Sequence, residues 1–254
     1  MCHSSSVQPP VSAYESWRWA LLAAIMLAPA SVAAQDADDF QSWASVAATV
    51  DAAPRPPALS FWLDVHARRA SESTAVLVRP GVGVVVVDWL SLWAGYAWIP
   101  TFDDAAGGEA SHEHRIWEQA QAQHRFDFGL ALQARARLEQ RFVEGAGDVG
   151  VRARQFVRVN WQPSAEVPLG VAIWDELFVG LNDTGWGQAS GFDQNRLFVG
   201  LFLLAPPWAR LEAGYLFVYR DRGGADLYTH ALAINLFVSA RPPAPPVEDP
   251  EAPR

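Results

Sequence analysis

The sequence predicts an all-β protein, an antiparallel up-and-down transmembrane β-barrel of about twelve strands, with ten to twelve as the range. From Phe40 onward, apolar side chains alternate with polar or small ones, which is the period of a β-strand. The alternating segments are longer than the five or six residues that are usual for strands of soluble domains. Tryptophans lie near the segment ends, and short connections alternate with long ones, as in barrels of the bacterial outer membrane.

Eleven segments are predicted as strands, because turn-forming residues separate them. They cover residues 40–50, 59–69, 75–87, 90–99, 113–124, 128–142, 150–161, 169–180, 192–204, 208–220 and 227–239. Single-chain bacterial barrels usually have an even number of strands, with both ends in the periplasm. We therefore expect twelve strands, with ten as the next choice.

The tryptophans near segment ends are interpreted as aromatic girdles at the two interfaces between membrane and water. They are Trp43, Trp62, Trp89, Trp93, Trp98, Trp117, Trp161, Trp174 and Trp208. The connections at 124–127 and 205–207 are short, whereas those at 100–112 and 182–191 are long. This difference is typical of tight periplasmic turns and longer outer loops.

A soluble β-sandwich or a lipocalin-like barrel would show the same alternation of side chains. In such a protein the apolar face points inward and the charged face points to water, whereas a membrane barrel exchanges the two faces. The long segments, the aromatic distribution and the unequal connections favour the membrane barrel.

Residues 1–34 are predicted to be a signal peptide that is removed on export. Arg18 precedes a short apolar run at residues 20–30, and small residues follow the run, so cleavage is expected after Ala34. A membrane anchor is the alternative, but the run has about eleven residues and a spanning helix needs about 20. Residues 35–240 are assigned to the barrel, and the Pro-rich, acidic residues 241–254 to a disordered tail.

The charge and the cysteine content exclude several classes of protein. The net charge is −9, and all 19 basic residues are arginine. An acidic balance argues against nucleic acid as a partner, because binding of phosphates requires a basic patch. The single cysteine, Cys2, precedes the apolar run, so the exported chain is expected to have no disulfide, no thiolate nucleophile and no cysteine metal site.

Charged and amide side chains occupy every second position of the strand predicted at 128–142, with leucine and alanine between them. The next strand repeats the pattern with Arg152, Arg154 and Arg158. Because an arginine facing lipid near the midplane costs about 2–4 kcal/mol, these rows are predicted to face the lumen. The candidate lumen and binding residues are Glu113, Arg115, Arg135, Arg137, Glu139, Arg141, Arg152, Arg154, Glu176 and Arg196.

Two interpretations of these ten residues remain open. In the first, arginine and glutamate pair with each other, fill a narrow lumen and serve only the structure of the barrel. In the second, the surplus of arginine attracts a small anionic solute, such as a carboxylate, a phosphate or a sugar acid, into a narrow pore. Both interpretations place the chain in the bacterial outer membrane, with the surrounding lipid as a partner.

The histidines do not predict a catalytic or metal site. His112 and His114 adjoin Ser111 and Glu113, but consecutive strand residues point to opposite faces, and a catalytic triad depends on geometry. No third metal ligand is evident beside the two histidines. We therefore expect no enzyme activity, no metal and no cofactor. A lipid hydrolase or acyl transferase of the outer membrane is one alternative, and a soluble periplasmic barrel that binds an apolar ligand is another.

Several motifs, taken in order, resemble the bacterial family catalogued as domain of unknown function 2490. They are "RPGVGVVVVDWLSLWAGYAWIP", "EHRIWEQ", "ARARLEQRF", "RARQFVR", "WDELF", "GFDQNRLFVGL" and "LEAGYLF". The resemblance covers about residues 40–238. It implies an exported protein that forms an outer-membrane β-barrel with the help of the barrel-assembly machinery, and it implies no particular activity.

The resemblance also marks individual positions. Those that match the motifs are Glu113, Arg115, Trp117, Gln119, Arg137, Glu139, Arg141, Arg152, Arg154, Asp175, Glu176, Phe192, Asp193, Gln194, Asn195 and Arg196. One departure is the tail that follows the last predicted strand. Outer-membrane chains commonly end on an aromatic residue that is used in assembly, and here Phe237 would have to serve from an internal position.

Overall fold

The computed structural model describes residues 37–104, 108, 110–164, 166–205, 208–221 and 226–242, and these form eleven β-strands. The strands are β1 (Ala37–Asp51), β2 (Ala58–Arg69), β3 (Ser73–Val87), β4 (Leu90–Asp103), β5 (Ala110–Arg125), β6 (Leu130–Val143), β7 (Val149–Trp161), β8 (Leu169–Gly180), β9 (Gly191–Leu204), β10 (Ala209–Arg220) and β11 (Leu227–Ala240). Each predicted segment overlaps one of them. Within the described residues, no helix is long and apolar enough to cross a bilayer. The predicted signal peptide, residues 1–34, and residues 243–254 of the predicted tail lie outside the described residues.

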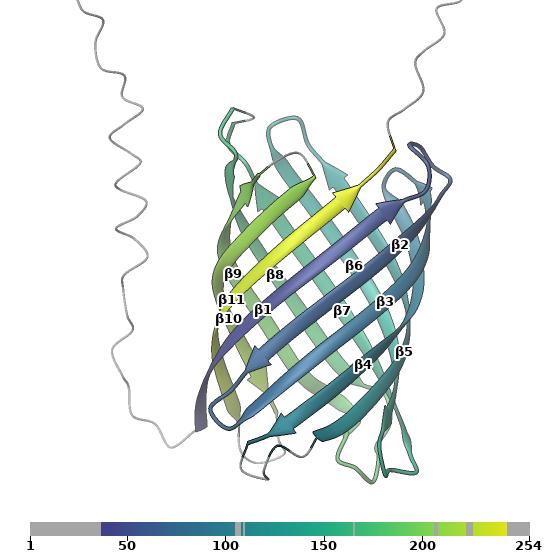
Figure 1. Ribbon diagram of the computed structural model, residues 1–254, viewed down its shortest axis with the longest axis vertical. Helices are drawn as coiled ribbons and strands as arrows, with labels where there is room; N and C mark the ends of the chain where they lie inside the picture. Colours follow the sequence, from purple (N-terminus) through teal and green to yellow (C-terminus); the bar gives the residue numbers. More distant parts are fainter. Residues whose placement is uncertain are drawn as a thin grey trace, which may run out of the picture. The chain divides into compact units, whose positions relative to one another are not determined.

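Each strand pairs antiparallel with the next, and the sheet closes into a barrel where β11 meets β1. This closing pair is parallel, with Ala37 opposite Leu227 and Val50 opposite Ala240 (Figure 1). Eleven strands fall within the predicted range, but the preference for an even number is not met. Strands that alternate in direction return to the first direction at every odd position, so an odd barrel must close in parallel. The antiparallel prediction therefore holds for every pair except β1 and β11.

The two ends of the barrel are named by the chain ends that they carry. The N rim contains the start of β1 and the connections at 70–72, 104–109, 144–148, 181–190 and 221–226. The C rim contains the end of β11 and the connections at 52–57, 88–89, 126–129, 162–168 and 205–208. Because β1 and β11 run in the same direction, the barrel begins at one rim and ends at the other (Figure 1). The connections predicted to be long lie at the N rim, and the two predicted to be short lie at the C rim.

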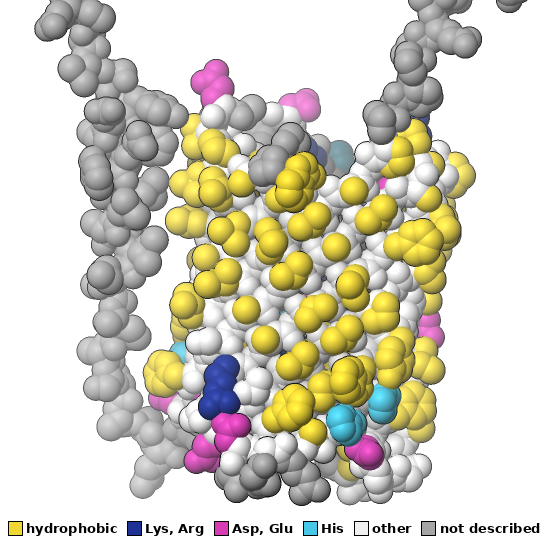
Figure 2. Space-filling model, viewed as in Figure 1, with side chains coloured by type: hydrophobic (Ala, Val, Ile, Leu, Met, Phe, Trp, Pro, Cys, Tyr) yellow, Lys and Arg dark blue, Asp and Glu magenta, His cyan; other side chains and the backbone are white. Residues whose placement is uncertain are grey.

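Side chains alternate between the two faces of the wall, as the period of a strand requires. On β2, the outward Phe61 and Leu63 are 51% and 47% exposed, whereas the inward Ser60 and Asp64 are 0% and 3% exposed. The same arrangement, apolar side chains outward and polar ones inward, holds around the barrel. Among the described residues, 36 large hydrophobic side chains are exposed, and all but Trp89, Phe128, Leu181 and Trp208 lie on strands. Figure 2 shows them spread over the outer face, whereas most charged and histidine side chains of this view lie near its lower and upper edges.

The interior is filled by side chains of two kinds. One hydrophobic cluster joins β1 and β8–β11 around Phe198 and Phe202, and another joins residues of β3–β5 around Trp117. Charged and amide side chains of β5–β9 fill much of the remaining space. The charged lumen therefore has an aromatic and aliphatic lining beside it.

The prediction that nine tryptophans form girdles is wrong for more than half of them. Trp98, Trp161 and Trp208 are exposed, and Trp89, which is also exposed, lines the interior cavity at the C rim. The other five take part in the interior clusters; they are Trp43, Trp62, Trp93, Trp117 and Trp174. A position near a strand end does not determine the face, because the face depends only on whether the position is odd or even along the strand.

Inward aromatic rings lie on inward glycines. The ring of Trp117 covers Gly81 and Gly95, and the ring of Phe198 covers Gly200 and Gly214. A Cβ atom at Gly95 would lie 2.4 Å from both the carbonyl oxygen of Pro80 and the Trp117 ring. These glycines leave the space that allows large rings to lie flat inside a small barrel.

We expect Gly95→Val to lower the free energy of unfolding by about 1–3 kcal/mol, because the added side chain overlaps both a ring and a backbone oxygen. Gly147→Val is the matched control, since a Cβ atom there meets nothing within 4 Å. Thermal unfolding followed by circular dichroism measures both variants. Equal melting temperatures would show that the interior accepts a side chain at Gly95.

Candidate functional site

The structure places all ten sequence-predicted site residues inside the barrel. Six of them are at most 8% exposed: Arg137, Glu139, Arg152, Arg154, Glu176 and Arg196. They come from β5–β9, whose neighbouring rows lie side by side; Arg137 is opposite Gln119 on β5 and opposite Arg154 on β7. We call these ten residues the belt. Nine of its members are joined by ion pairs, and Arg196 stands apart.

Glu139 is the centre of the belt. Its carboxylate accepts hydrogen bonds from Arg152 Nη2 at 2.7 Å and from Arg154 Nη1 at 2.5 Å. The guanidinium groups of Arg115 and Arg137 lie 3.7 and 3.8 Å from it. One fully buried carboxylate therefore faces four cations, so the local charge is positive even after pairing.

Glu176 extends the belt toward the C rim. Its Oε1 atom accepts hydrogen bonds from Arg154 Nε and Nη2, at 3.1 and 2.7 Å, and from Arg135. Arg196 lies directly opposite Glu176 in the pairing of β8 with β9, yet the structure gives it no hydrogen bond to a described residue. Its guanidinium instead lies over the rings of Phe178 and Trp43, at 4.4 and 5.1 Å from their centroids.

The belt ends at the N rim beneath the β8–β9 connection. Glu113 pairs with Arg115 and Arg141, and Arg141 Nη1 donates to Gln188 Oε1 at 3.1 Å. The Arg141 guanidinium also lies 4.8 Å from the ring centroid of Trp186. The Ser190 backbone N–H donates to Asp183 at 2.7 Å, which lowers the pKa of that carboxyl. The connection is thus fixed to the belt and folded over the rim.

Two further charged groups lie inside the barrel and were not among the predicted site residues. Asp64 on β2 pairs with Arg79 and with His66 Nε2, the latter at 2.6 Å. Glu212 on β10 accepts from Arg158 Nη2 and Arg210 Nη2, each at 2.9 Å. The second group connects β7 with β10 inside the barrel.

The sequence does contain a signal for these groups. Asp64, His66 and Arg68 stand at every second position, as the charges of the belt do, and Arg210 and Glu212 are spaced in the same way. Each row is shorter than the row on β6, so the pattern is weaker there. Strand parity applied to every charge would have found them.

A cavity of about 530 Å³ lies inside the barrel and reaches the C rim. Its lining includes Asp88 and Trp89 of the β3–β4 connection and Arg241 beyond β11. None of the described residues that line it belongs to an N-rim connection. Its lining contains seven arginines and four carboxylates, an excess of three positive charges by subtraction. This arrangement can attract and hold an anion.

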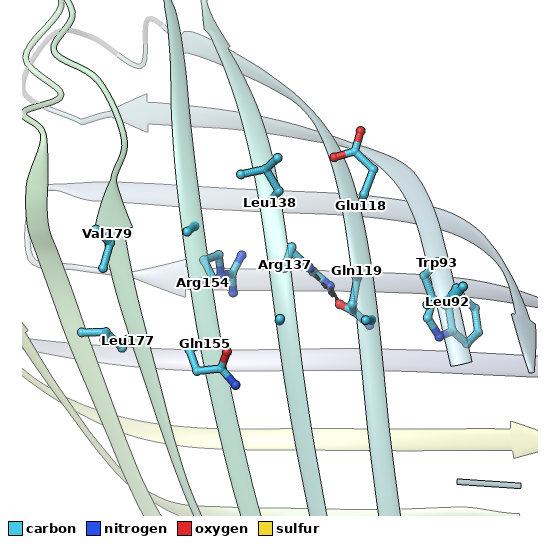
Figure 3. Close-up of a pocket in the computed structure, with 13 residues that line it drawn as sticks. Leu92, Trp93, Glu118, Gln119, Arg137, Leu138, Arg154, Gln155, Leu177 and Val179 are labelled. Atoms are coloured by element: carbon cyan, nitrogen blue, oxygen red, sulfur yellow. Dashed lines mark hydrogen bonds between the residues drawn. The ribbon is translucent and has the colours of Figure 1, made fainter. Parts of the chain in front are cut away.

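A second hollow, of about 540 Å³, follows the wall over β4–β8, where small outward side chains leave space. Figure 3 shows its lining from both faces: the inward Arg137 and Gln119, joined by a hydrogen bond of 2.9 Å from Nε, and the outward Glu118 and Leu138. The outer wall is not wholly apolar. Glu118 accepts a hydrogen bond from Gln140 at 3.3 Å, so this outward carboxylate has a partner.

The motif residues Asp175 and Asn195 also point outward and pair at 3.0 Å, whereas their neighbours Glu176 and Arg196 point inward. Of Asp175 and Glu176, only Glu176 thus stands beside Arg196 in the lumen. His112 and His114 lie on the outer wall near the N rim, where their rings stack on Trp98 and Tyr96.

We expect Glu139→Gln to lower the free energy of unfolding by about 3–5 kcal/mol, because it leaves buried arginines without their counter-charge. Glu118→Gln makes the same chemical change on the outer wall, and its effect should stay within about 0.5 kcal/mol. Denaturant unfolding followed by tryptophan fluorescence measures both. If both variants unfold at the wild-type denaturant concentration, the belt does not stabilise the barrel.

Comparison with known proteins identifies a family but no activity. The family model described as "Protein of unknown function (DUF2490)" matches residues 40–229. An uncharacterised protein of Methylorubrum extorquens is 34% identical over 170 residues, which cover 66% of this chain and 74% of the relative. No solved structure matches the chain. The chain belongs to the DUF2490 family.

Proposed function

We propose that this chain is a bacterial outer-membrane protein whose lumen is a narrow pore for small anionic solutes. The observation that carries the membrane assignment is the inversion of the wall, with Phe61 and Leu63 outside and Asp64 inside. Soluble monomers rarely expose contiguous apolar patches larger than a few hundred Å². A wall whose strands expose so many large hydrophobic side chains is suited to hydrocarbon and not to water.

Strand lengths and aromatic positions support the same proposal. A tilted strand crosses a membrane with about 9–11 residues, and the strands here have 12–16. Outward aromatic residues occur near both rims, with Tyr96, Trp98 and Tyr215 toward the N rim and Trp161 and Trp208 at the C rim. Two such bands suit the two interfaces of a bilayer.

The charge of the lumen supports an anionic solute. The cavity at the C rim contains more arginine than carboxylate, and the arginines of the belt continue from its floor toward the N rim. Guanidinium groups bind carboxylate and phosphate through two parallel hydrogen bonds. An anion that enters at the C rim therefore meets one guanidinium after another.

The belt also favours a second function, that of a closed structural barrel. Arg137 on β6 lies 5.2 Å from the ring centroid of Trp62 on β2, although these strands are not neighbours. Trp62 and Trp117 also meet, at 5.4 Å between ring centroids. Such contacts leave a narrow passage at most, and conduction decides between the two functions.

We expect the protein to sediment with outer membranes and to enter solution only with detergent. Unheated samples should migrate differently from boiled samples on a denaturing gel, because a closed sheet without edges resists the detergent. A soluble periplasmic protein and a known outer-membrane barrel from the same cells serve as controls. Recovery of the folded protein in the soluble fraction would refute the membrane assignment.

We expect the purified protein to give stepwise currents in planar lipid bilayers. In a potassium chloride gradient, the reversal potential should lie toward the value for chloride, because the lumen is positive. Protein that has been unfolded by boiling is the control and should give no steps. Preference for potassium would contradict the anion pore, and silence at every voltage would favour the structural barrel.

A further inference from the structure

We propose that the C-rim cavity is a binding site for acidic sugars, with Arg68 and Arg196 holding the carboxylate. This inference rests on the proposed anionic solute and names its class. The site is distinct from the ion pairs of the belt, because neither guanidinium takes part in one.

Arg68 and Arg196 are cations of the cavity lining that have no ion-pair partner among the described residues. Both line the cavity, and neither has a hydrogen bond or an ion pair with any described residue. The other cavity arginines on the strands, for example Arg79 and Arg154, bond to Asp64 and Glu176. A guanidinium removed from water is costly without a counter-charge, so these two positions are prepared for an anion from outside.

Trp43 brings the two cations together. The Arg68 guanidinium lies 4.2 Å and that of Arg196 5.1 Å from the Trp43 ring centroid, although the residues come from β2 and β9. Two planar cations against one ring provide several parallel N–H donors for a single carboxylate.

The rest of the cavity suits hydroxyl groups. The side-chain amides of Gln121, Gln123 and Gln133 line it, and the structure gives them no hydrogen bonds within the described part of the chain. Gln123 and Gln133 are direct partners across β5 and β6, and Gln121 is two residues along. Each amide offers donors and an acceptor, as the hydroxyl groups of a sugar require.

Size and aromatic faces distinguish a sugar acid from an inorganic anion. The volume of about 530 Å³ is within the range of pockets that hold small organic ligands. Trp62, Trp93 and Trp174 add indole rings to the lining, and the apolar face of a sugar ring packs on such surfaces. A phosphate ion would use the two arginines and leave the amides and the rings without a function.

Calorimetry on the detergent-solubilised wild-type protein tests the proposal, with glucuronate, glucose, acetate and inorganic phosphate as probes. Glucuronate should bind at least about tenfold more tightly than each of the others, because it alone engages both the arginines and the amides. Phosphate binding as tight as that of glucuronate would overturn the assignment to a sugar acid. Absence of glucuronate binding to the folded protein would overturn the site.

Arg68→Gln and Arg196→Gln should each weaken glucuronate binding by about tenfold or more. Arg69→Gln is the matched control, since Arg69 is the neighbour of Arg68, points outward and pairs with Asp104 at the N rim. The affinity of Arg69→Gln for glucuronate should remain that of the wild type. A loss of affinity as large as that of the two lumen variants would refute the site. If either lumen variant does not fold, Gln121→Leu tests the site, because it should weaken glucuronate and leave acetate unchanged.

Binding in detergent does not depend on conduction. If the protein binds glucuronate but carries no current, the proposed binding site is supported and the proposed pore is refuted. If the protein conducts anions but does not bind glucuronate, the proposed pore is supported and the proposed binding site is refuted.

Discussion

The rest of the structure depends on one constraint: a charge that faces into this small barrel is costly unless it finds a partner there. Removal of a guanidinium or a carboxylate from water costs several kcal/mol unless an opposite charge and hydrogen bonds replace the water. Glu139 meets the constraint for four arginines at once, and Glu176 and Glu212 do so for others. The network that results joins strands that are not neighbours, so the lumen is held from within as well as by the sheet.

The constraint also separates structure from function inside the lumen. Arginines that bond to a carboxylate are accounted for by the fold, and they form a belt that narrows the passage. Arg68 and Arg196 are not accounted for in this way, and both line the interior cavity together with the amides of Gln121, Gln123 and Gln133. The cavity lining thus keeps a surplus of positive charge that the fold does not neutralise, and an anion from outside can balance it.

The alternation of side chains along a strand, here called strand parity, explains how much of the structure could be predicted from the sequence alone. It located the eleven strands and the belt, because Arg137 and Glu139 belong to a long row and a row on one face of a strand stays together. It also gives Trp117 the face of Glu113 and Arg115, but it could not show how so large a ring fits there, because Gly81 and Gly95 of two other strands make the room. It could not pair Glu212 with Arg158 either, since their strands are separated by two others and only closure of the barrel brings them together.

The parallel pairing of β1 with β11 has a consequence for how such barrels can change in evolution. Gain or loss of a whole hairpin alters the strand number by two, so an odd barrel remains odd and keeps its parallel seam. An even barrel requires the gain or loss of a single strand, and that moves one end of the barrel from one rim to the other. The same parity prevents a short peptide from joining Ala37 to Ala240, so a circular permutant of this barrel needs a linker as long as the barrel is tall.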